Sequence, residues 1–590
     1  MFTSTTKTES NGGNEQYKMK PQSILVFTGD KESSADSYTS IVAFLNRLIP
    51  PNVYTMNRLT PNALHGHPWI DENCIALIVY NYNDINSIGW ARIQQYCNRK
   101  NSHIWLLCDD RLLEDIRQTY IHNSVLLRAL GPQVVPWVRS EEFSKFVTRF
   151  SEMANNNDQI SHEFNFSSTK SDKTSNWHLA FTKHQSDPLL LSLKNDLNTS
   201  KIKALLSNSS ADDLKALAKD SALFKMLASS AFLPMTATSS DESVVPEFTN
   251  GYLMCQKDSL IFDIPGLSYG KTFASDPELI FENTSRLQTK NVTLPTPNLT
   301  TFPIEVRQRK MELLDYGFDS EKYFTRLQTK QVGRVLVFAP VCESTIPISK
   351  NLSSVFPESD GILVVAGVQI QGRGRGANQW LSPKGCALMT LNYSVVLNSV
   401  LGQSIGIVQL LMAVAVVDAL SGLVGIKNFP LNIKWPNDLY IGRDKKMGGV
   451  LVSAGSRGDV FYCTISCGLN VANSKPIGCI NDMLPDEKKL CLEDVFAAVM
   501  NKFEYHVNQF QKGHKEEFLR KYHQYWLHTN EEVSIMHQDT TSIEKVIIQG
   551  VDEFGYLRVR SKDSGRVFSV HDDGNSFDMM KGLIHPKKYT

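Results

Sequence analysis

Residues 361–417 contain neither aspartate nor glutamate, although the whole chain of 590 residues carries 61 acidic and 61 basic side chains. Within this window, residues 361–370 and 386–394 are mostly apolar and have the pattern of buried strands. Residues 405–417 are the most apolar run of the chain but are too few to span a bilayer, and a buried core helix is predicted over residues 405–420. The window therefore predicts two buried strands and a core helix, with a connection between the strands that carries no negative charge.

The connection between the two predicted strands is rich in glycine and arginine. Residues 372–376 read Gly-Arg-Gly-Arg-Gly, and Lys384 adds a further positive charge. Glycine lets the backbone approach a ligand closely, and the guanidinium groups of Arg373 and Arg375 match carboxylate and phosphate oxygens. An exposed basic turn is the simpler alternative. A dinucleotide-binding loop would need an acidic residue about 20 positions later, and none is present there. We therefore predict an anion-binding loop.

Four further motifs flank this loop. Glu343-Ser344-Thr345 precedes it, and residues 434–438 (Lys-Trp-Pro-Asn-Asp), 446–451 (Lys-Met-Gly-Gly-Val-Leu) and 468–471 (Gly-Leu-Asn-Val) follow it. Together, in this order and spacing, the five motifs resemble the signature of the biotin protein ligases, or holocarboxylase synthetases. Residues 571–578 are similar to the eukaryotic members. The resemblance covers the C-terminal part of the chain well and the first 300 or so residues only loosely.

The resemblance implies an ATP-dependent ligase. ATP and biotin would be its substrates and Mg²⁺ its ion. Biotinyl-AMP would form first, and a lysine of a biotin carboxyl carrier domain of a carboxylase would then accept the biotin. Lipoate–protein ligases, which share the fold and the adenylate chemistry, remain one alternative. A bifunctional biotin-responsive DNA-binding regulator is another, although the N-terminal region is not basic and alternates strands with helices.

The resemblance also implies the roles of individual residues. The predicted catalytic residues are Arg373, Arg375, Lys434 and Lys446. The predicted biotin-binding residues are Ser344, Thr345, Gln369, Gly372, Arg373, Trp380, Lys446 and Gly449. The predicted nucleotide-binding residues are Arg375, Trp380, Asn437, Asp438 and Asn470, and Asp438 is also the candidate Mg²⁺ ligand. These types suit their partners, because neutral amides and hydroxyls match a ureido ring and oxygen ligands match Mg²⁺.

Simpler explanations exist for several of these residues. Trp380 could be a core residue rather than a wall for adenine or for the valeryl tail of biotin. The Pro-Asn-Asp of residues 436–438 is also a common turn sequence. Ser344 and Thr345 could cap a turn without contacting any ligand. Lys445 is interpreted as a solvated neighbour of Lys446.

The predicted fold is multidomain α/β. Residues 1–21 are expected to be a disordered tail, and residues 22–150 an α/β scaffold similar to glutamine amidotransferases, with strands at 23–27, 74–80 and 103–108. The cysteines in that scaffold lack the Gly-x-Cys-x-Gly elbow of a nucleophile, so it is expected to be non-catalytic. Residues 151–322 are predicted to be a linker and regulatory region, with a polar linker at 151–175, rich in Ser, Asn, Lys and Asp, and a helical segment near 211–231. Residues 323–530 would form an α+β catalytic core like that of class-II synthetases, with further strands at 431–435, 449–453 and 460–467. Residues 531–590 would form an SH3-like β-barrel.

Composition sets the remaining expectations. With 42% hydrophobic and 21% charged residues and no net charge, nothing favours a nucleic-acid or membrane partner. The ten cysteines include no Cys-x-x-Cys pair, and Cys463 and Cys467 lie in an apolar run, so buried reduced thiols are expected. The polar first 20 residues do not have the pattern of a signal peptide. We expect a cytoplasmic protein, with a mitochondrial or nuclear pool possible, that is a monomer or weak dimer.

Overall fold

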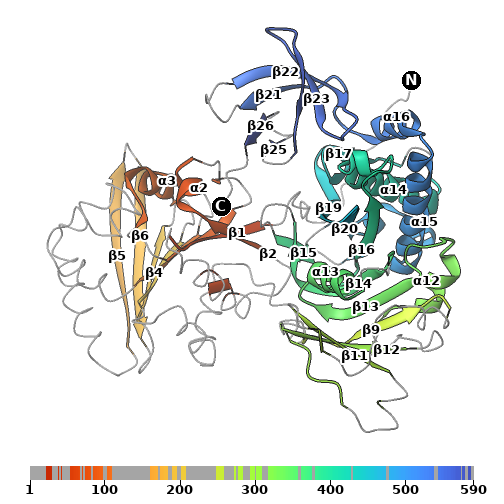
Figure 1. Cartoon of the computed structure of the whole chain (residues 1–590). Coiled ribbons are helices and arrows are strands. Elements are labelled where there is room, and N and C mark those ends of the chain that lie inside the picture. The colour runs from red at the N-terminus through yellow and green to blue at the C-terminus, as the bar shows by residue number, and fades with distance from the viewer. Residues whose placement is uncertain are drawn as a thin grey trace, which may run out of the picture.

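Three β-sheets organise the described part of the chain in this computed structural model (Figure 1). Apart from five isolated positions, the described residues are 22–29, 54–66, 69–70, 74–80, 84–97, 103–108, 160–170, 173–183, 189–195, 201–206, 247–257, 272–273, 277–283, 293–298, 300–307, 317–356, 360–374, 379–426, 429–473, 478–536, 543–572, 575–578 and 583–586. The predicted tail at 1–21 and the helical pattern at 211–231 lie outside them.

The N-terminal sheet has eight strands in the order β2-β1-β3-β4-β8-β7-β6-β5. Its first four strands are parallel, with helices α2 (Pro61–Gly66) and α3 (Ser87–Cys97) between them in the chain. The strand predictions at 23–27, 74–80 and 103–108 are confirmed, whereas β2 was not predicted. These strands are β1 (Gln22–Phe27), β2 (Tyr54–Leu59), β3 (Cys74–Val79) and β4 (His103–Cys108).

The second half of this sheet corrects the predicted linker. Residues 151–175 were interpreted as linker because they are rich in Ser, Asn, Lys and Asp. Strands β5 (Ile160–Lys170) and β6 (Lys173–Lys183) instead pair along their whole lengths, followed by β7 (Leu189–Asn195) and β8 (Lys201–Leu206). The prediction failed because backbone ladder hydrogen bonds do not depend on apolar side chains, so composition alone cannot exclude an antiparallel pair.

The central sheet has twelve strands and begins well before the predicted catalytic boundary at 323. Its first strands are β9 (Gly251–Cys255), β10 (Thr272–Phe273), β11 (Glu278–Asn283) and β12 (Thr301–Val306), and β9 pairs antiparallel with β13 (Val335–Cys342). Buried side chains of β9, β11 and β12 share one apolar cluster with β13 and β14. The interpretation of 247–307 as part of a linker and regulatory region is therefore wrong, because these strands complete the central sheet.

The rest of the central sheet follows the predicted pattern. From β13 the order runs β14-β16-β20-β19-β18-β17, and β15 pairs with β14. The strands predicted at 361–370, 386–394, 431–435, 449–453 and 460–467 are all present. Their bounds are β14 (Leu363–Arg373), β15 (Gln379–Ser382), β16 (Cys386–Val396), β17 (Leu431–Lys434), β18 (Asp438–Ile441), β19 (Lys445–Arg457) and β20 (Val460–Asn470).

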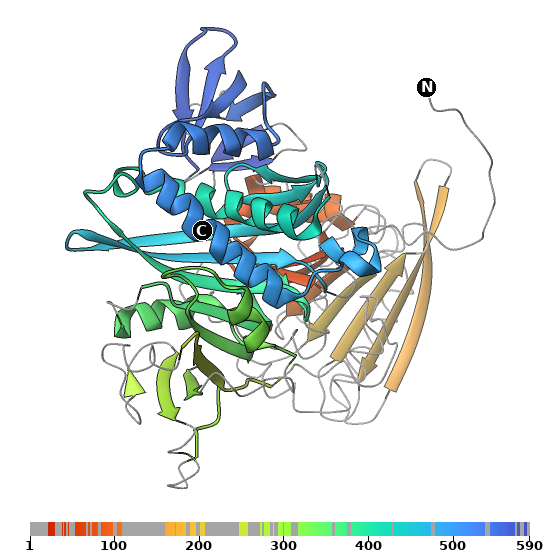
Figure 2. The same ribbon diagram turned by 90° about the vertical axis from the view of Figure 1, so that its right-hand side faces the viewer.

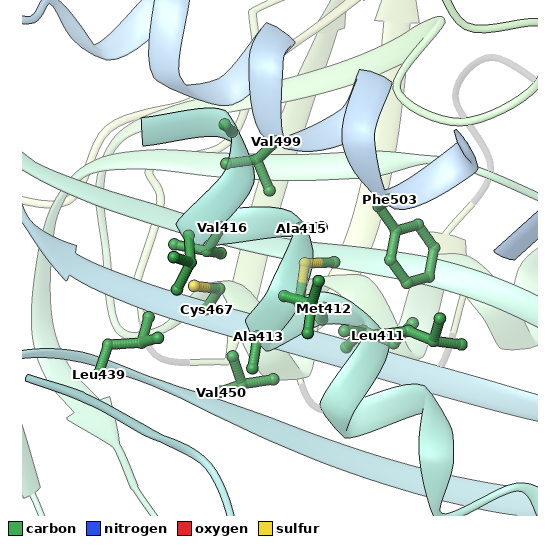
Figure 3. Close-up of a cluster of buried hydrophobic side chains, with 14 of the residues drawn as sticks. Leu411, Met412, Ala413, Ala415, Val416, Leu439, Val450, Cys467, Val499 and Phe503 are labelled. Atoms are coloured by element: carbon green, nitrogen blue, oxygen red, sulfur yellow. The ribbon is translucent and has the colours of Figure 1, made fainter. Parts of the chain in front are cut away.

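Helices α14 (Ile407–Val424) and α15 (Leu492–Gln511) pack on each other and against this sheet, in front of the strands in Figure 2. Helix α14 is long and apolar enough to cross a membrane by length and composition, but 72% of it is buried inside the protein. Its Leu411, Met412 and Val416 lie in one cluster with side chains of the sheet and of α15 (Figure 3). The prediction of a core helix is confirmed.

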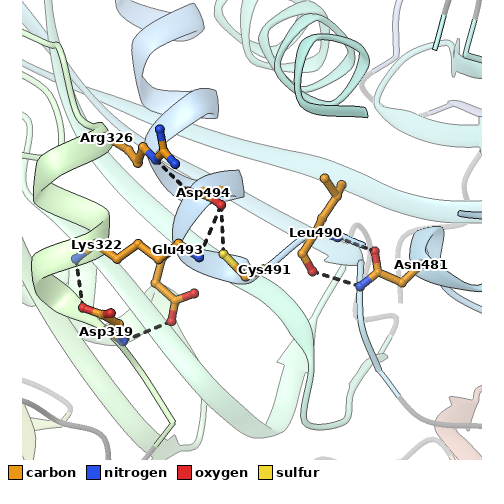
Figure 4. Close-up of polar contacts among 8 residues, drawn as sticks. All are labelled: Asp319, Lys322, Arg326, Asn481, Leu490, Cys491, Glu493 and Asp494. Atoms are coloured by element: carbon orange, nitrogen blue, oxygen red, sulfur yellow. Dashed lines mark hydrogen bonds and ion pairs between the residues drawn. The ribbon is translucent and has the colours of Figure 1, made fainter. Parts of the chain in front are cut away.

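Two shorter helices lie at and after the predicted boundary at 323. Helix α13 (Thr345–Val355) packs on β14 and β16, and α12 (Ser320–Arg326) packs on α15. At the start of α15, Asp494 pairs with Lys322 at 3.5 Å and Arg326 at 3.3 Å, and Glu493 accepts a hydrogen bond from the Asp319 amide (Figure 4). These contacts also place residues before 323 in the central unit.

One buried carboxylate lies among the helices. Asp418 of α14 contacts His506 Nε2 at 2.7 Å, Lys521 Nζ at 2.8 Å and the Tyr525 hydroxyl at 2.5 Å, the last two from α16 (Lys515–Tyr525). Burial alone would raise the pKa of Asp418, but the hydrogen bonds from these three side chains outweigh it and lower the pKa to about 2. The carboxylate therefore stays charged and ties three helices together.

We expect Asp418→Asn to destabilise the chain by roughly 2–3 kcal/mol, because it leaves the Lys521 ammonium group without its anion and weakens the hydrogen bonds with His506 and Tyr525. Since the folded-state pKa is lowered, the stability from Asp418 is present above about pH 4 and is lost as the pH falls toward 2. Urea unfolding at neutral pH checks the loss, with the exposed Asp444→Asn as control. Equal midpoints for the two variants would contradict this role.

The C-terminal sheet has six strands in the order β24-β23-β22-β21-β26-β25. They are antiparallel except for the parallel pair β21 and β26. A turn of this sheet reaches the central unit, where the Gly555 carbonyl accepts a hydrogen bond from Trp435 Nε1 at 3.1 Å. The strands are β21 (Glu532–Met536), β22 (Ile543–Val551), β23 (Leu557–Ser561), β24 (Val567–Val570), β25 (Asn575–Asp578) and β26 (Leu583–Pro586).

Candidate functional site

The glycine-arginine stretch leaves the sheet at the end of β14 and returns as β15. Gly372 faces Trp380 in the register of these two strands, and a Cβ atom on Gly372 would come within 2.4 Å of the Trp380 carbonyl oxygen. Only glycine fits this close approach. Arg373 is largely exposed and forms an ion pair with Glu343 at 2.7 Å. Arg375 lies outside the described residues.

Trp380 stands over the neighbouring strands. A Cβ atom on Gly468 of β20 would lie 2.7 Å from the indole nitrogen, so the glycine makes room for the ring. The other neighbour is Lys446, whose Nζ is 5.5 Å from the ring centroid. The indole is half-buried, and its Nε1 has no hydrogen-bond partner among the described residues. The Trp380 ring therefore packs against the core strand β20 and also lies near the charged Lys446.

Lys434 and Lys446, which we call the lysine pair, both contact the carboxylate of Asp438 near the Trp380 ring. Asp438, the first residue of β18, contacts Lys446 Nζ at 2.7 Å and Lys434 Nζ at 3.5 Å. Gly449 pairs with Asp438 across the sheet, and a Cβ atom there would meet the carboxylate at 3.3 Å. All three charged side chains are at least two-thirds buried. Two positive charges and one negative charge leave this group with a net positive charge suited to an anion.

A buried and uncharged hydrogen-bond network includes Ser382, which donates to the Trp380 carbonyl at 3.3 Å. Gln369 Oε1 accepts from the Thr345 amide at 2.8 Å and from its hydroxyl at 3.1 Å, and Gln369 Nε2 donates to Ser382 Oγ at 3.2 Å. The Thr345 hydroxyl also contacts Thr390, which donates to Ser466. We call these five residues, Thr345, Gln369, Ser382, Thr390 and Ser466, the polar hub.

Strand register explains why the hub forms. Strands β13 and β14 are parallel, with Cys342 opposite Gln369, so the residues just after β13 lie beside Gln369. Ser344 there is the N-cap of α13 and accepts from the Ile346 amide at 3.4 Å. The pairing of β16 with β20 places Thr390 opposite Ser466. The sequence analysis missed three of these residues, Ser382, Thr390 and Ser466. Thr390 and Ser466 are polar residues within largely apolar strands, which is a signal that could have revealed them.

The two predicted nucleotide-binding asparagines are both buried and both have partners within the protein. Asn437 donates through Nδ2 to the Val450 carbonyl at 2.5 Å, which fixes the turn before Asp438. Asn470 accepts through Oδ1 from the Cys386 thiol at 3.4 Å, at the end of β20. These contacts position the strands around the lysine pair. The nucleotide-binding roles of Asn437 and Asn470 stay predictions.

The thiols near the site are not nucleophiles. Burial raises the pKa of both Cys342 and Cys386 far above the usual thiol range. Burial also raises the pKa of Cys463 and of Cys467 to about 12, and both are buried as predicted. The thiolate is the reactive form of cysteine, so these groups are inert at neutral pH.

The arrangement does not fit a resident Mg²⁺ ion on Asp438. Its carboxylate already contacts two ammonium groups, and a cation would have to displace them. Among the residues that the structure describes, no group of three or more His, Cys, Asp or Glu side chains could hold a metal ion. Asp438 is therefore better suited to position the two lysines.

Comparison with known proteins places this site in a family context. Residues 338–470 match the model of the biotin/lipoate A/B protein ligase family. The chain is 42% identical to a human biotin–protein ligase over 279 residues, 46% of this chain and 38% of the human protein. It is 31% identical to biotin–protein ligase 2 of Arabidopsis thaliana over 318 residues, 52% of this chain and 94% of the plant protein.

A solved structure of a biotin protein ligase from Aquifex aeolicus, in complex with biotin and ATP, aligns with 41% of this chain and 100% of its own length. That alignment has 21% identity and a TM-score of 0.32. The sequence match to the human protein thus spans well under two thirds of that relative's length, whereas the plant protein is covered almost completely.

Proposed function

Because this chain belongs to the biotin–protein ligase family, we propose that it activates biotin with ATP as biotinyl-AMP and transfers it to a lysine of a biotin carboxyl carrier domain. The observation that carries the proposal is that Trp380 contacts both groups: its backbone carbonyl accepts a hydrogen bond from Ser382 of the polar hub at 3.3 Å, and Lys446 Nζ lies 5.5 Å from the centre of its ring. One end of this arrangement is neutral and the other is positive. Biotin is complementary to this arrangement, because it has a neutral ureido ring at one end and a negatively charged carboxylate at the other.

The polar hub suits the ureido ring. A ureido group offers two N–H donors and one strong acceptor, and hydroxyl and amide groups can exchange hydrogen bonds with both kinds of atom. Thr345 begins α13 shortly after β13 ends, and Gln369 of β14 lies opposite the last residue of β13, so the two side chains meet at this point of the sheet. Ser344, next to them, would complete the predicted biotin-binding set.

The lysine pair suits the reacting carboxylate and phosphate. A carboxylate resists attack because its charge is delocalised, so its oxygen must first attack the α-phosphate of ATP, with pyrophosphate leaving. Two anions must approach each other, and fixed positive groups offset their repulsion and the charge of the transition state. Lys446, beside the indole, would hold the biotin carboxylate, and Lys434 would contact the phosphates. Mg²⁺ would be held by phosphate oxygens of the nucleotide.

The two alternatives have less support. The dithiolane ring of lipoate has no hydrogen-bonding group that matches the polar hub, and the named relatives are biotin–protein ligases. A DNA-binding regulator would need a recognition element at the N-terminus. There, the described residues 22–108 form a parallel sheet with intervening helices rather than a helix-turn-helix unit.

Transfer of labelled biotin to a purified carboxyl carrier domain tests the proposal. We expect label on the acceptor only when ATP is present, and none on an acceptor whose target lysine is replaced by arginine. Labelled lipoate serves as the competing substrate in a parallel reaction. Labelling by lipoate at a similar rate would favour the lipoate ligase, and labelling by neither would refute the proposal.

The other regions have supporting roles in this proposal. The amidotransferase-like sheet would be a scaffold that modulates the site, which is supported by the contact of its edge strand β2 with β15, the strand that carries Trp380 (Figure 1). The C-terminal sheet would be an SH3-like cap on the nucleotide side. We further propose that carboxylases are the natural partners and that the protein acts in the cytoplasm as a monomer or weak dimer.

We also propose that Arg375 retains the activated intermediate, biotinyl-AMP, in the site. Lys434 and Lys446 stay in place in an Arg375→Gly variant, so activation should continue while one positive charge that holds the adenylate is lost. We expect faster release of labelled biotinyl-AMP and more labelling of bystander lysines. Stopped-flow or filter-binding release assays check this. An unchanged release rate would show that Arg375 does not retain the intermediate.

A further inference from the structure

His528, between α16 and β21, is fully buried and has two polar partners. Its Nε2 lies 3.1 Å from the backbone nitrogen of Trp435, and its Nδ1 lies 2.7 Å from Glu531 Oε2. A peptide N–H can only donate, so Nε2 must accept. The ring proton therefore sits on Nδ1 and is donated to Glu531. The two contacts fix one neutral tautomer of the imidazole.

The contacts of His528 extend to both ends of the β17–β18 hairpin. Glu531 also pairs with Arg443 at 3.0 Å, just after β18, and Arg443 donates to the Leu527 carbonyl at 2.8 Å. At the other end, the Leu527 amide donates to the Ile433 carbonyl at 3.0 Å. The segment around His528 thus holds the hairpin that carries Lys434 and Asp438.

The C-terminal sheet meets the hairpin at the same place. The Phe577 ring of β25 lies 4.8 Å from the His528 ring, between centroids, and Lys434 Nζ lies 5.9 Å from the Phe577 centroid. The Gly555 carbonyl of the same sheet accepts from the Trp435 indole. Trp435, next to Lys434, is therefore held through its backbone by His528 and through its side chain by the C-terminal sheet.

We propose that His528 is a positioning residue that sets Lys434 and its hairpin for adenylate formation by accepting the hydrogen bond of the Trp435 amide. The inference rests on the proposed function for its catalytic consequence. The polar hub is built on β14, β15, β16 and β20 and on the start of α13, and the hydrogen bonds that define it do not include His528. The effect of losing His528 should therefore fall on activation by ATP and not on the binding of biotin.

The charges around His528 favour the neutral ring that this role needs. Burial lowers its pKa, and the positive charges of Lys434 and Arg443 lower it further, while Glu531 acts in the opposite direction. The net pKa lies below the usual histidine value. A protonated ring would point an N–H at the Trp435 N–H, so the neutral form is the one that can hold the amide.

Two variants separate the acceptor from the rest of the side chain. In His528→Gln the amide oxygen can occupy the position of Nε2 and accept from Trp435. In His528→Asn the shorter side chain can reach the position of Nδ1 and donate to Glu531, but it leaves the Trp435 amide unpaired. We expect a roughly tenfold to hundredfold lower kcat for biotin-dependent pyrophosphate release in the Asn variant and less than about fivefold loss in the Gln variant. Biotin affinity measured by calorimetry should be unchanged in both.

Hydrogen exchange at the Trp435 amide provides a readout that does not depend on catalysis. We expect faster exchange in His528→Asn and near-wild-type exchange in His528→Gln. Equal losses of activity and equal exchange in the two variants would overturn the inference, because the imidazole would then act only by filling space. A parallel loss of biotin affinity would overturn it too. If the wild-type chain releases no pyrophosphate, the proposed function fails, and the exchange rates still decide whether His528 holds Trp435.

Discussion

Replacing Lys446 by alanine is expected to slow biotin-dependent pyrophosphate release by a factor of about 30 to 1,000. Lys446 lies at the meeting point of the site, with its Nζ 2.7 Å from Asp438 and 5.5 Å from the centre of the Trp380 ring. Removing a fixed donor at a developing charge costs about 2–4 kcal/mol of transition-state stabilisation. The variant also leaves Asp438 with one cation instead of two, so the group loses the net positive charge that would attract the incoming phosphates.

Lys445 provides the matched control for this experiment. It is the adjacent residue on the same strand, carries the same charge and is exposed to solvent. Lys445→Ala should keep the wild-type rate of pyrophosphate release. Near-normal release by Lys446→Ala, or an equal loss in both variants, would mean that Lys446 has no specific role in activation.

Truncating the chain tests where the catalytic unit begins. A fragment of residues 323–590 should be insoluble or unfolded, whereas a fragment of residues 247–590 should form biotinyl-AMP. The shorter fragment lacks β9 to β12 and loses, from the apolar cluster that these strands share with β13 and β14, seven buried residues, each worth about 1.5–3 kcal/mol on full burial. They are Leu253, Cys255, Leu279, Phe281, Phe302, Ile304 and Val306. The sum of about 10 kcal/mol or more equals the whole stability of an ordinary domain.

Circular dichroism and pyrophosphate release on the two fragments check this prediction. The longer fragment also tests whether the N-terminal sheet is needed for chemistry, because it lacks β1 to β8 and keeps every described residue of the proposed site. A folded and active 323–590 fragment would show that β9 to β12 are dispensable. An inactive but folded 247–590 fragment would give the N-terminal sheet a chemical role.

Local sequence patterns were enough to predict the centre of the fold. Long apolar runs such as those of β14, β16 and α14 have one dominant way to bury themselves, and their periodicity or length reveals it. Strands β5 and β6 are polar, and β9 to β12 are short and widely separated in the chain. Their structure depends on pairing with distant partners, which no local pattern encodes.

The candidate site was predictable to the extent that motifs mark it. Thr345, Gln369, Trp380, Lys446 and Asp438 are linked, through Ser382, by one chain of contacts. The sequence did not reveal that Arg373 would pair with Glu343, or that Asp438 would hold both lysines. These contacts follow from the three-dimensional arrangement of separate strands.

His528 shows the same limit most clearly. It lies 93 residues from Trp435 in the chain, and the surrounding sequence gives no sign that the two would form a hydrogen bond. Their contact depends on how the segment after α16 returns to the edge strand β17. Residues that position a catalytic group from a distance are therefore found by following hydrogen bonds outward from the site.

Isotope exchange between pyrophosphate and ATP tests the central claim most directly. The exchange reports reversible formation of an acyl adenylate by the full-length chain and needs no acceptor protein. We expect exchange that requires biotin and that lipoate does not support. Lys446→Ala should slow it by the factor of about 30 to 1,000 expected for activation, and Lys445→Ala should leave it unchanged. Exchange without biotin, equal exchange with lipoate, or no exchange by the wild-type chain would contradict the assignment of this site to biotin activation.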